Sequence, residues 1–364
     1  MPLDNVDLKY LRQSLQLAQK GKGKTFPNPL VGCVIVKYGV IIGSGYHHKA
    51  GGNHAEINAL EDAKESTIGA TLYVNLEPCS HHGKTPPCVD AIIKAGIARV
   101  ICCNLDSNNN VRGDGIQKLK AAGIEVEVGG LARDARKLNE AFFTFHELQR
   151  PFIAVKYAAS IDGKIATRTR KSKWITDNLA REYARTLRSS YQAILVGSNT
   201  VVQDNPHLGT RKKGYTDPLR IILDNTLKTS LTSHVYRDGN VIVFTSKKAA
   251  NSKLSAFKKR GIEVFVCKSD SVNIREVMVE LTKRTIISVY VEGGSTVLGS
   301  FNDAKLIDKI YAFLGPLLIG GETAKSAVGG EGADSLSTTL QLQDIHTKML
   351  GDSMLYEASV THTS

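Results

Sequence analysis

The residue types of a catalytic zinc site occur in three short segments of the first half of the chain. They are His54-Ala55-Glu56, Pro78-Cys79 and Pro87-Cys88. One imidazole and two thiolates supply three zinc ligands and leave the fourth position for water, as in catalytic sites. Glu56 lies two residues after the histidine, and we expect it to move a proton rather than bind metal. This pattern is typical of zinc-dependent deaminases of nucleobases. We therefore predict Zn²⁺ bound by His54, Cys79 and Cys88, with Glu56 as the catalytic residue.

One alternative to this catalytic site remains open. His81 or His82 is available as a fourth protein ligand, which would make the zinc structural. Eight residues separate Cys79 from Cys88, whereas two are typical of deaminases acting on nucleic acids and free nucleosides. The other cysteines lie in apolar segments, and we expect them to be core residues: Cys33, Cys102, Cys103 and Cys267.

A second candidate site is a glycine-rich turn, Gly293-Gly294-Ser295-Thr296, which lies between a predicted strand and a predicted helix. Glycines there let backbone amides approach a phosphate at the helix N-terminus. Many strand–helix turns carry two glycines for steric reasons alone, so the turn by itself is a weak signal. The chain has no Gly-x-Gly-x-x-Gly in a first βαβ unit, which disfavours a Rossmann dinucleotide domain.

Composition narrows the class of protein. The chain has 364 residues, of which 42% are hydrophobic and 23% charged, as in ordinary globular proteins of two or three domains. No apolar stretch approaches the roughly 20 residues that a membrane helix needs, and the N-terminus does not resemble a signal peptide. We expect a cytoplasmic protein without a membrane partner. Most of the net charge of +12 comes from the second half, which favours an anionic ligand there.

Strands and helices alternate along the whole chain, which predicts an α/β fold. In the first half we expect strands at 30–36, 40–42, 70–75, 99–103 and 124–128, and helices at 8–18, 54–63, 87–95, 117–122 and 131–148. In the second half we expect strands at 152–155, 193–196, 220–223, 241–244, 264–267, 287–291 and 309–314, and helices at 178–187, 253–260, 274–283 and 296–306. Pro151 marks a boundary between domains at 1–148 and 149–364.

Several longer segments occur together and in the order of one family. They are Pro27-Asn28-Pro29-Leu30-Val31-Gly32, Gly45-Tyr46-His47, the stretch 78–88, Lys156 to Lys164, Ser172 to Thr176, Val196 to Thr200, Asp204-Asn205-Pro206 and Val291 to Ser295. In these segments the chain resembles the bifunctional deaminase/reductase of riboflavin biosynthesis. The resemblance implies a cytidine-deaminase-like three-layer αβα domain followed by a dihydrofolate-reductase-like α/β domain, and a homo-oligomer.

The resemblance also implies two reactions. The first domain would deaminate 2,5-diamino-6-ribosylamino-4(3H)-pyrimidinone 5′-phosphate with zinc. The second would reduce the ribosyl group with NADPH to give 5-amino-6-ribitylaminouracil 5′-phosphate. The partners would be small molecules and not nucleic acid.

Residue roles follow from the resemblance position by position. Substrate contacts are implied for Ser172, Arg188, Leu208, Arg211 and Glu292, with the arginines suited to its phosphate. Cofactor contacts are implied for Ala158, Trp174, Thr200, Asp204, Asn225, Gly294, Ser295, Thr296, Val297, Leu298, Gly299 and Ser300. Lys156 is a candidate to polarise the sugar carbonyl, or equally a strand lysine paired with an acid such as Glu292. Trp174 is equally a core or rim aromatic.

Two segments depart from the family's pattern. The stretch 106–115 lacks the two prolines of the usual Asp-Pro-Asn-Pro, so we expect a less rigid loop but retained deaminase activity, because the zinc ligands and Glu56 are present. The stretch 168–171 is more basic than usual. Three other hypotheses therefore stay open: a nucleic-acid deaminase, an enzyme with one decayed domain, and a non-catalytic zinc-stabilised binding module.

Overall fold

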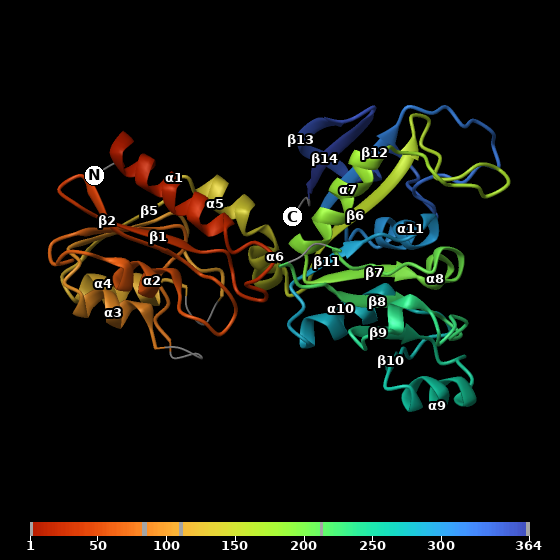
Figure 1. The fold of residues 1–364 in the computed structure, drawn as a ribbon, viewed down its shortest axis with the longest axis horizontal. Helices are drawn as coiled ribbons and strands as arrows, with labels where there is room; N and C mark the ends of the chain where they lie inside the picture. Colours follow the sequence, from red (N-terminus) through yellow and green to blue (C-terminus); the bar gives the residue numbers. More distant parts are fainter. Residues whose placement is uncertain (1–2, 82–85, 109–111, 212–213, 362–364) are drawn as a thin grey trace. The chain divides into compact units, whose positions relative to one another are not determined.

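The computed structural model describes residues 3–81, 86–108, 112–211 and 214–361. The chain forms two compact units, Met1–Gln149 and Arg150–Ser364 (Figure 1). No helix within the described ranges combines the length and apolar character needed to cross a bilayer.

A five-stranded sheet forms the centre of the first unit, in the order β2-β1-β3-β4-β5. The strands are β1 (Gly32–Lys37), β2 (Val40–Tyr46), β3 (Thr71–Val74), β4 (Arg99–Cys102) and β5 (Glu125–Val128). The helices are α1 (Asn5–Gln19), α2 (Ala55–Asp62), α3 (Cys88–Lys94), α4 (Asp114–Ala121), α5 (Ala132–Leu138) and α6 (Glu140–Leu148). Strand β1 is antiparallel to β2 and β3, whereas β3, β4 and β5 are parallel.

Alternation of side chains along the strands gives this unit three layers. Leu72 and Val74 belong to a core that includes residues of α2, α3 and α4. Tyr73, between them, belongs to a second core with residues of α1 and α5. The sheet is therefore covered by helices on both faces, as predicted.

One predicted element of this unit is wrong. A continuous helix over 131–148 was expected, but it is interrupted at Asn139, which separates α5 from α6. The Asn139 side chain accepts from the Leu30 amide at 2.7 Å and donates to the Leu30 carbonyl at 2.9 Å. Because these bonds join residues 109 positions apart, helical periodicity does not reveal them.

The second unit contains a nine-stranded sheet in the order β10-β9-β8-β7-β11-β6-β12-β14-β13. Its strands are β6 (Phe152–Ser160), β7 (Ala193–Gly197), β8 (Leu219–Leu223), β9 (Val241–Thr245), β10 (Glu263–Val266), β11 (Ser288–Val291), β12 (Lys309–Gly315), β13 (Gln341–Leu350) and β14 (Ser353–Thr361). Its α-helices are α7 (Asn178–Leu187), α8 (Ser198–Asp204), α9 (Asn251–Lys259), α10 (Ile274–Lys283) and α11 (Ser295–Asp303). Short 3-10 helices cover Arg188–Ser190, His234–Tyr236 and Leu336–Thr338.

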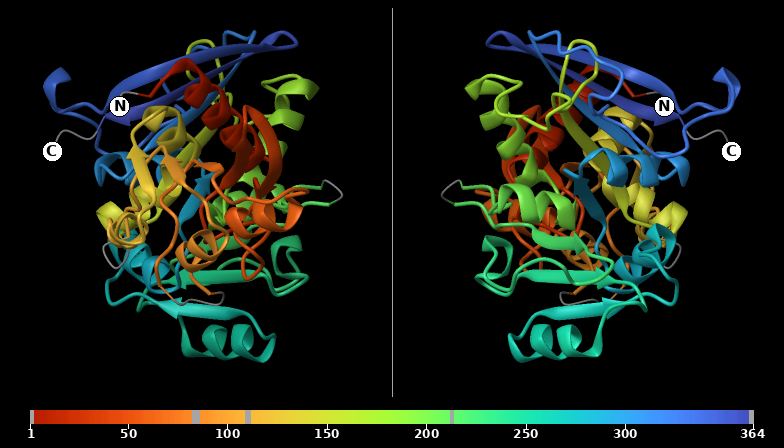
Figure 2. Two further views of the ribbon diagram at one scale, coloured as in Figure 1. Left: turned by 90° about the vertical axis from the view of Figure 1, so that its left-hand side faces the viewer. Right: turned by 90° about the vertical axis from the view of Figure 1, so that its right-hand side faces the viewer.

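Strands β6 to β12 pair in parallel, whereas β14 is antiparallel both to β12 and to β13, with which it forms a hairpin. Figure 2 shows this hairpin, in blue, at one end of the sheet and β10, in teal, at the other. The hairpin and helix α8 were not predicted. Most of β13 is exposed on both faces, so it lacks the alternation of polar and apolar residues by which a half-buried strand is recognised.

The parallel strands decide where a site can form. The carboxyl ends of β6, β7, β8 and β11 meet at one edge of the sheet, because these strands are neighbours and run in the same direction. Ligands of open α/β sheets bind at this edge.

Candidate functional site

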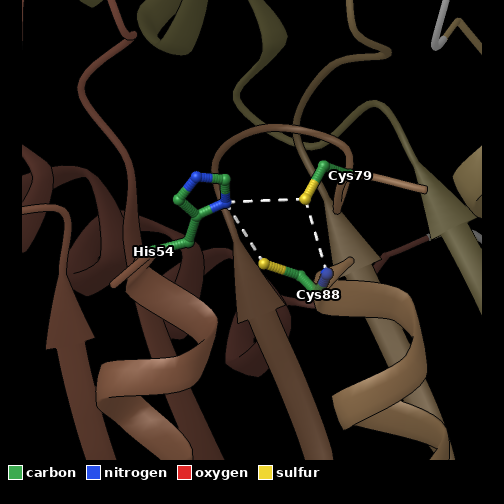
Figure 3. Close-up of side chains that lie close together, drawn as sticks. All are labelled: His54, Cys79 and Cys88. Atoms are coloured by element: carbon green, nitrogen blue, oxygen red, sulfur yellow. Dashed lines mark hydrogen bonds between the residues drawn. The ribbon is translucent and has the colours of Figure 1, made fainter. Parts of the chain in front are cut away.

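The structure of the first unit brings His54, Cys79 and Cys88 together (Figure 3). The His54 Nδ1 atom lies 3.5 Å from the Cys79 Sγ atom and 3.3 Å from the Cys88 Sγ atom. Tetrahedral zinc with ordinary bond lengths separates a nitrogen and a sulfur ligand by about 3.6 Å. The three donors therefore fit a zinc ion.

Each ligand is placed by the start of a helix or by the loop beside it. His54 is the N-cap residue of α2, and Cys88 is the first residue of α3. The Cys88 backbone amide donates to the Cys79 Sγ atom at 3.4 Å, which ties the loop to the helix. The Cys79 sulfur thus accepts a backbone amide at the start of a helix, a position that favours thiolate.

The two thiols of this cluster have pKa values that are shifted in opposite directions. A hydrogen bond from Cys88, with further contributions from the Cys88 amide and His54, lowers the pKa of Cys79 below its usual value. The bond to Cys79 and burial raise the pKa of Cys88. Burial raises the pKa of Glu56 to about 7, and its carboxyl lies against the Cys88 thiol. A carboxyl that titrates near neutrality is suited to proton transfer.

The described residues add no fourth protein ligand to this cluster. His81 is exposed and does not join it, and His82 lies outside the described residues. Within these ranges the donor set is that of an open site.

A second histidine, which was not predicted as a site residue, lies beside this cluster. The ring of the buried His47 meets the His54 ring edge-on, with centroids 5.4 Å apart. Its Nδ1 atom lies 3.0 Å from the Asn53 carbonyl oxygen, so Nδ1 is the donor and Nε2 accepts from Asn28 at 3.0 Å. Burial lowers the pKa of His47, which keeps this ring neutral. The segments that contain Asn28 and His47 were recognised only as marks of the family.

In the second unit, most of the predicted cofactor residues lie at or directly after neighbouring strands. Ala158 is in β6, Thr200 follows β7 in α8, and Asn225 follows β8. Residues 294–300 follow β11 and begin α11. A Cβ added to Gly197 would lie 2.8 Å from Val297, so the end of β7 and the start of α11 are close.

The predicted cofactor residues differ in what their side chains can reach. Leu298 is buried in the core, so only its backbone is available to a ligand. The Asn225 side chain accepts from the Val272 amide at 2.7 Å. A Cβ on Gly299 would lie 2.3 Å from the Gly329 carbonyl carbon, so the helix packs directly against this loop.

Trp174 is not a core residue, since 65% of it is exposed. The Arg181 guanidinium lies 4.4 Å from its ring centroid and Lys173 lies 5.8 Å away. Lys173 also forms an ion pair with Asp204 at 3.3 Å. The two predicted cofactor residues Trp174 and Asp204 are therefore linked through Lys173.

The predicted substrate residues Arg188 and Glu292 form a bidentate ion pair. The Arg188 Nε atom lies 2.7 Å from one Glu292 oxygen, and Nη2 lies 3.0 Å from the other. Arg188 Nη1 donates to the Gly209 carbonyl at 2.9 Å. Lys156 lies 3.9 Å from Glu292, the pairing that was considered as its alternative role. These bonds use three of the five donors of the guanidinium, so the expected phosphate contact of Arg188 is restricted to the other two.

The remaining predicted substrate residues flank this ion pair or lie on the surface. Leu208 is buried next to Gly209, whereas Ser172 and Arg211 are exposed. Arg168, Arg170 and Lys171 of the basic stretch are exposed as well.

Comparison with known proteins covers both units. Residues 4–104 match the cytidine and deoxycytidylate deaminase zinc-binding region, and residues 151–356 match the RibD C-terminal domain. Riboflavin biosynthesis protein RibD of Aquifex aeolicus is 42% identical over 351 residues, which cover 96% of this chain and 97% of the relative. The protein of the same name from Bacillus amyloliquefaciens is 44% identical over 94% of this chain and 93% of its own.

Solved structures agree along the whole chain. Acinetobacter baumannii RibD, form 1, superposes with a TM-score of 0.89 at 33% identity, covering 98% of this chain and 99% of that one. A diaminohydroxyphosphoribosylaminopyrimidine deaminase/5-amino-6-(5-phosphoribosylamino)uracil reductase from Thermotoga maritima has a TM-score of 0.86 at 37% identity, with the same coverage.

Proposed function

The chain belongs to the RibD family of bifunctional deaminases and reductases of riboflavin biosynthesis, and from this membership we propose which residues carry each step. The deaminase is residues 1–148, and it acts on 2,5-diamino-6-ribosylamino-4(3H)-pyrimidinone 5′-phosphate. The reductase is residues 149–364, and it reduces the ribosyl group of the product to the ribityl group with NADPH.

In the deamination step, His54, Cys79 and Cys88 hold zinc. When bound, zinc supplies a Lewis acid that activates water for attack on the ring carbon bearing the amino group. Glu56 takes a proton from that water and gives it to the leaving amine, which departs as ammonia. The depth at which Glu56 is buried excludes bulk water from this proton transfer, since only 3% of the residue is exposed.

In the reduction step, the carboxyl edge of the second sheet holds the cofactor and the sugar. NADPH, when bound, supplies a hydride to C1′ of the ribosyl group. The backbone amides at the start of α11 suit a phosphate of the cofactor. Lys156, held beside Glu292, stabilises negative charge on the sugar oxygen, and Arg188 keeps Glu292 ionised and oriented.

One observation supports the deaminase assignment above all: three zinc donors and the buried Glu56 carboxyl lie close together in the first unit. The test is the Glu56→Gln variant of the full chain, with Glu65→Gln, an exposed residue, as the matched control. We expect Glu56→Gln to retain zinc and lose ammonia release, while it still reduces deaminated substrate. Deamination at the wild-type rate by Glu56→Gln would refute the assignment.

A mass spectrum of the product tests the two steps together. Incubation of wild-type protein with the diaminopyrimidine phosphate, zinc and NADPH should give a product that is both deaminated and reduced. A product that is only deaminated or only reduced would instead support an enzyme with one decayed domain.

We also propose that the protein acts in the cytoplasm as a homo-oligomer on small molecules, without nucleic acid or membrane as partners. The basic second unit is explained by the phosphates of substrate and cofactor. Sedimentation velocity tests the oligomer, and a gel-shift experiment with transfer RNA tests nucleic-acid binding. A shift at physiological salt would favour the nucleic-acid deaminase instead.

A further inference from the structure

A buried carboxylate two residues before Cys79 bonds to four backbone amides. Glu77 Oε2 accepts from the amides of Asp106 and Gly113, each at 3.0 Å. Glu77 Oε1 accepts from those of Gly115 and Ile116, at 3.0 and 3.3 Å. Glu77 is only 3% exposed, and each of its two carboxylate oxygens accepts two of these hydrogen bonds.

Three of these amides lie at the start of α4, within 113–116, and the amide of Asp106 lies in the loop that follows β4. Gly113, the N-cap residue of α4, has a φ of 85° and offers no side chain to the first-turn amides. No proline lies between 104 and 116 to stiffen the backbone. The Glu77 carboxylate therefore acts as the cap of α4 from a distant strand end, where its charge also meets the positive end of the helix.

Two more contacts fasten α4 to the segment that leads into Cys79. A Cβ added to Gly115 would lie 2.2 Å from the Pro78 carbonyl oxygen, so the two backbones touch. Lys118 Nζ donates to the Ser80 carbonyl at 2.8 Å. The metal ligand Cys79 and helix α4 are thus parts of one bonded assembly.

The loop held in this way borders the zinc cluster. Asp106, whose amide bonds to Glu77, is close enough to Cys79 and His81 for their charges to act on its carboxyl. The backbone that Glu77 holds therefore lies beside the segment that carries the metal ligand Cys79.

We propose that Glu77 is a positioning residue for deamination: it fixes the backbone of Asp106 and of residues 113–116 beside the zinc cluster, and so sets how the pyrimidine is bound. The proposal rests on the proposed function. In this proposal Glu77 contacts neither the metal nor the substrate. Removal of the Glu77 carboxylate should therefore weaken substrate binding more than it slows the chemical step.

The test is Glu77→Gln in the full chain with zinc bound. An amide turns an NH₂ group toward two of the four donors, which leaves those two amides buried without an acceptor. We expect KM for the diaminopyrimidine phosphate to rise about tenfold or more, since each lost charge-assisted bond has that order of effect. kcat should fall by less, and zinc content and the KM of the reductase should not change.

Two matched variants and a second measurement isolate the effect. Glu65→Gln makes the same chemical change at an exposed site and should leave KM unchanged. Glu77→Asp keeps the charge on a shorter side chain and should give an intermediate KM. Amide hydrogen exchange of peptides covering 104–117 should be faster in Glu77→Gln, and this measurement needs no substrate.

The outcomes separate this proposal from the function on which it rests. If the wild type releases ammonia and Glu77→Gln has a KM within about twofold of it, or unchanged exchange at 104–117, the positioning role is refuted. If Glu77→Gln loses zinc, the kinetic constants of Glu77→Asp are measured in its place. A lower kcat at an unchanged KM in that variant would refute the proposal. If neither the wild type nor Glu65→Gln releases ammonia, the proposed deaminase function fails, and the positioning role with it.

Discussion

Removing Arg188 should leave a buried carboxylate poorly compensated and destabilise the reductase unit. In the wild type, Glu292 receives two bonds from Arg188, at 2.7 and 3.0 Å, and both side chains are nearly buried, with 13% and 11% exposed. In Arg188→Met the remaining cation is Lys156 at 3.9 Å. Breaking a buried pair on one side costs about 3 kcal/mol, which is the lower end of the usual range. We take the lower end because Lys156 remains.

That cost corresponds to a fall of about 6–12 °C in the unfolding temperature of a unit of this size. The assay is scanning calorimetry of the full chain, in which the transition that NADPH shifts upward belongs to the reductase unit. Glu292→Gln and the double variant complete a cycle. The double variant should lose less stability than the sum of the two single variants, because either single change already breaks the Arg188–Glu292 pair.

The pH dependence of this effect has a definite sign. Although burial opposes it, the charges of Arg188 and Lys156 hold the pKa of Glu292 below its usual value. A lowered carboxyl pKa stabilises the folded state above the pKa of the unfolded chain, and this stabilisation is lost as the pH falls through the folded pKa. Arg188→Met should raise the pKa of Glu292, so its deficit should be largest near neutral pH and smaller in acid. Additive effects in the cycle, or a deficit independent of pH, would refute this account of the pair.

Three further predictions test other parts of the structure. Chelation of zinc should abolish ammonia release but leave NADPH-dependent reduction of deaminated substrate intact, and loss of both activities would contradict separate sites. Gly299→Ala places a Cβ 2.3 Å from the Gly329 carbonyl carbon, so we expect a cost of about 1–3 kcal/mol and weaker NADPH binding in a fluorescence titration; an unchanged Kd would refute the close packing. Asn139→Ala removes both bonds to Leu30 and should destabilise the deaminase unit by about 1–3 kcal/mol in calorimetry, whereas an unchanged transition would show that the break between α5 and α6 needs no anchor.

The zinc cluster was predictable because each of its ligands sits in a short motif. His54 with Glu56, and Cys79 and Cys88 after prolines, are recognisable from residue type and spacing alone. The α/β class was predictable for a similar reason, since buried strands and amphipathic helices leave a local periodicity in the chain. The break at Asn139 and the edge strand β13 leave no such periodicity, and both were missed.

Short stretches of the sequence therefore determine the ligands of the zinc site, the glycine-rich start of α11, and the order of strands and helices along the chain. What only the tertiary structure decided is which partner each polar group has. Arg188 meets Glu292 across 104 positions, and Glu77 holds amides that lie 29 to 39 positions away. Such pairings depend on how strands are ordered in a sheet and on the burial that makes an unpaired charge or amide costly. Neither the order of the strands nor the burial of a side chain can be predicted from the neighbouring residues in the sequence.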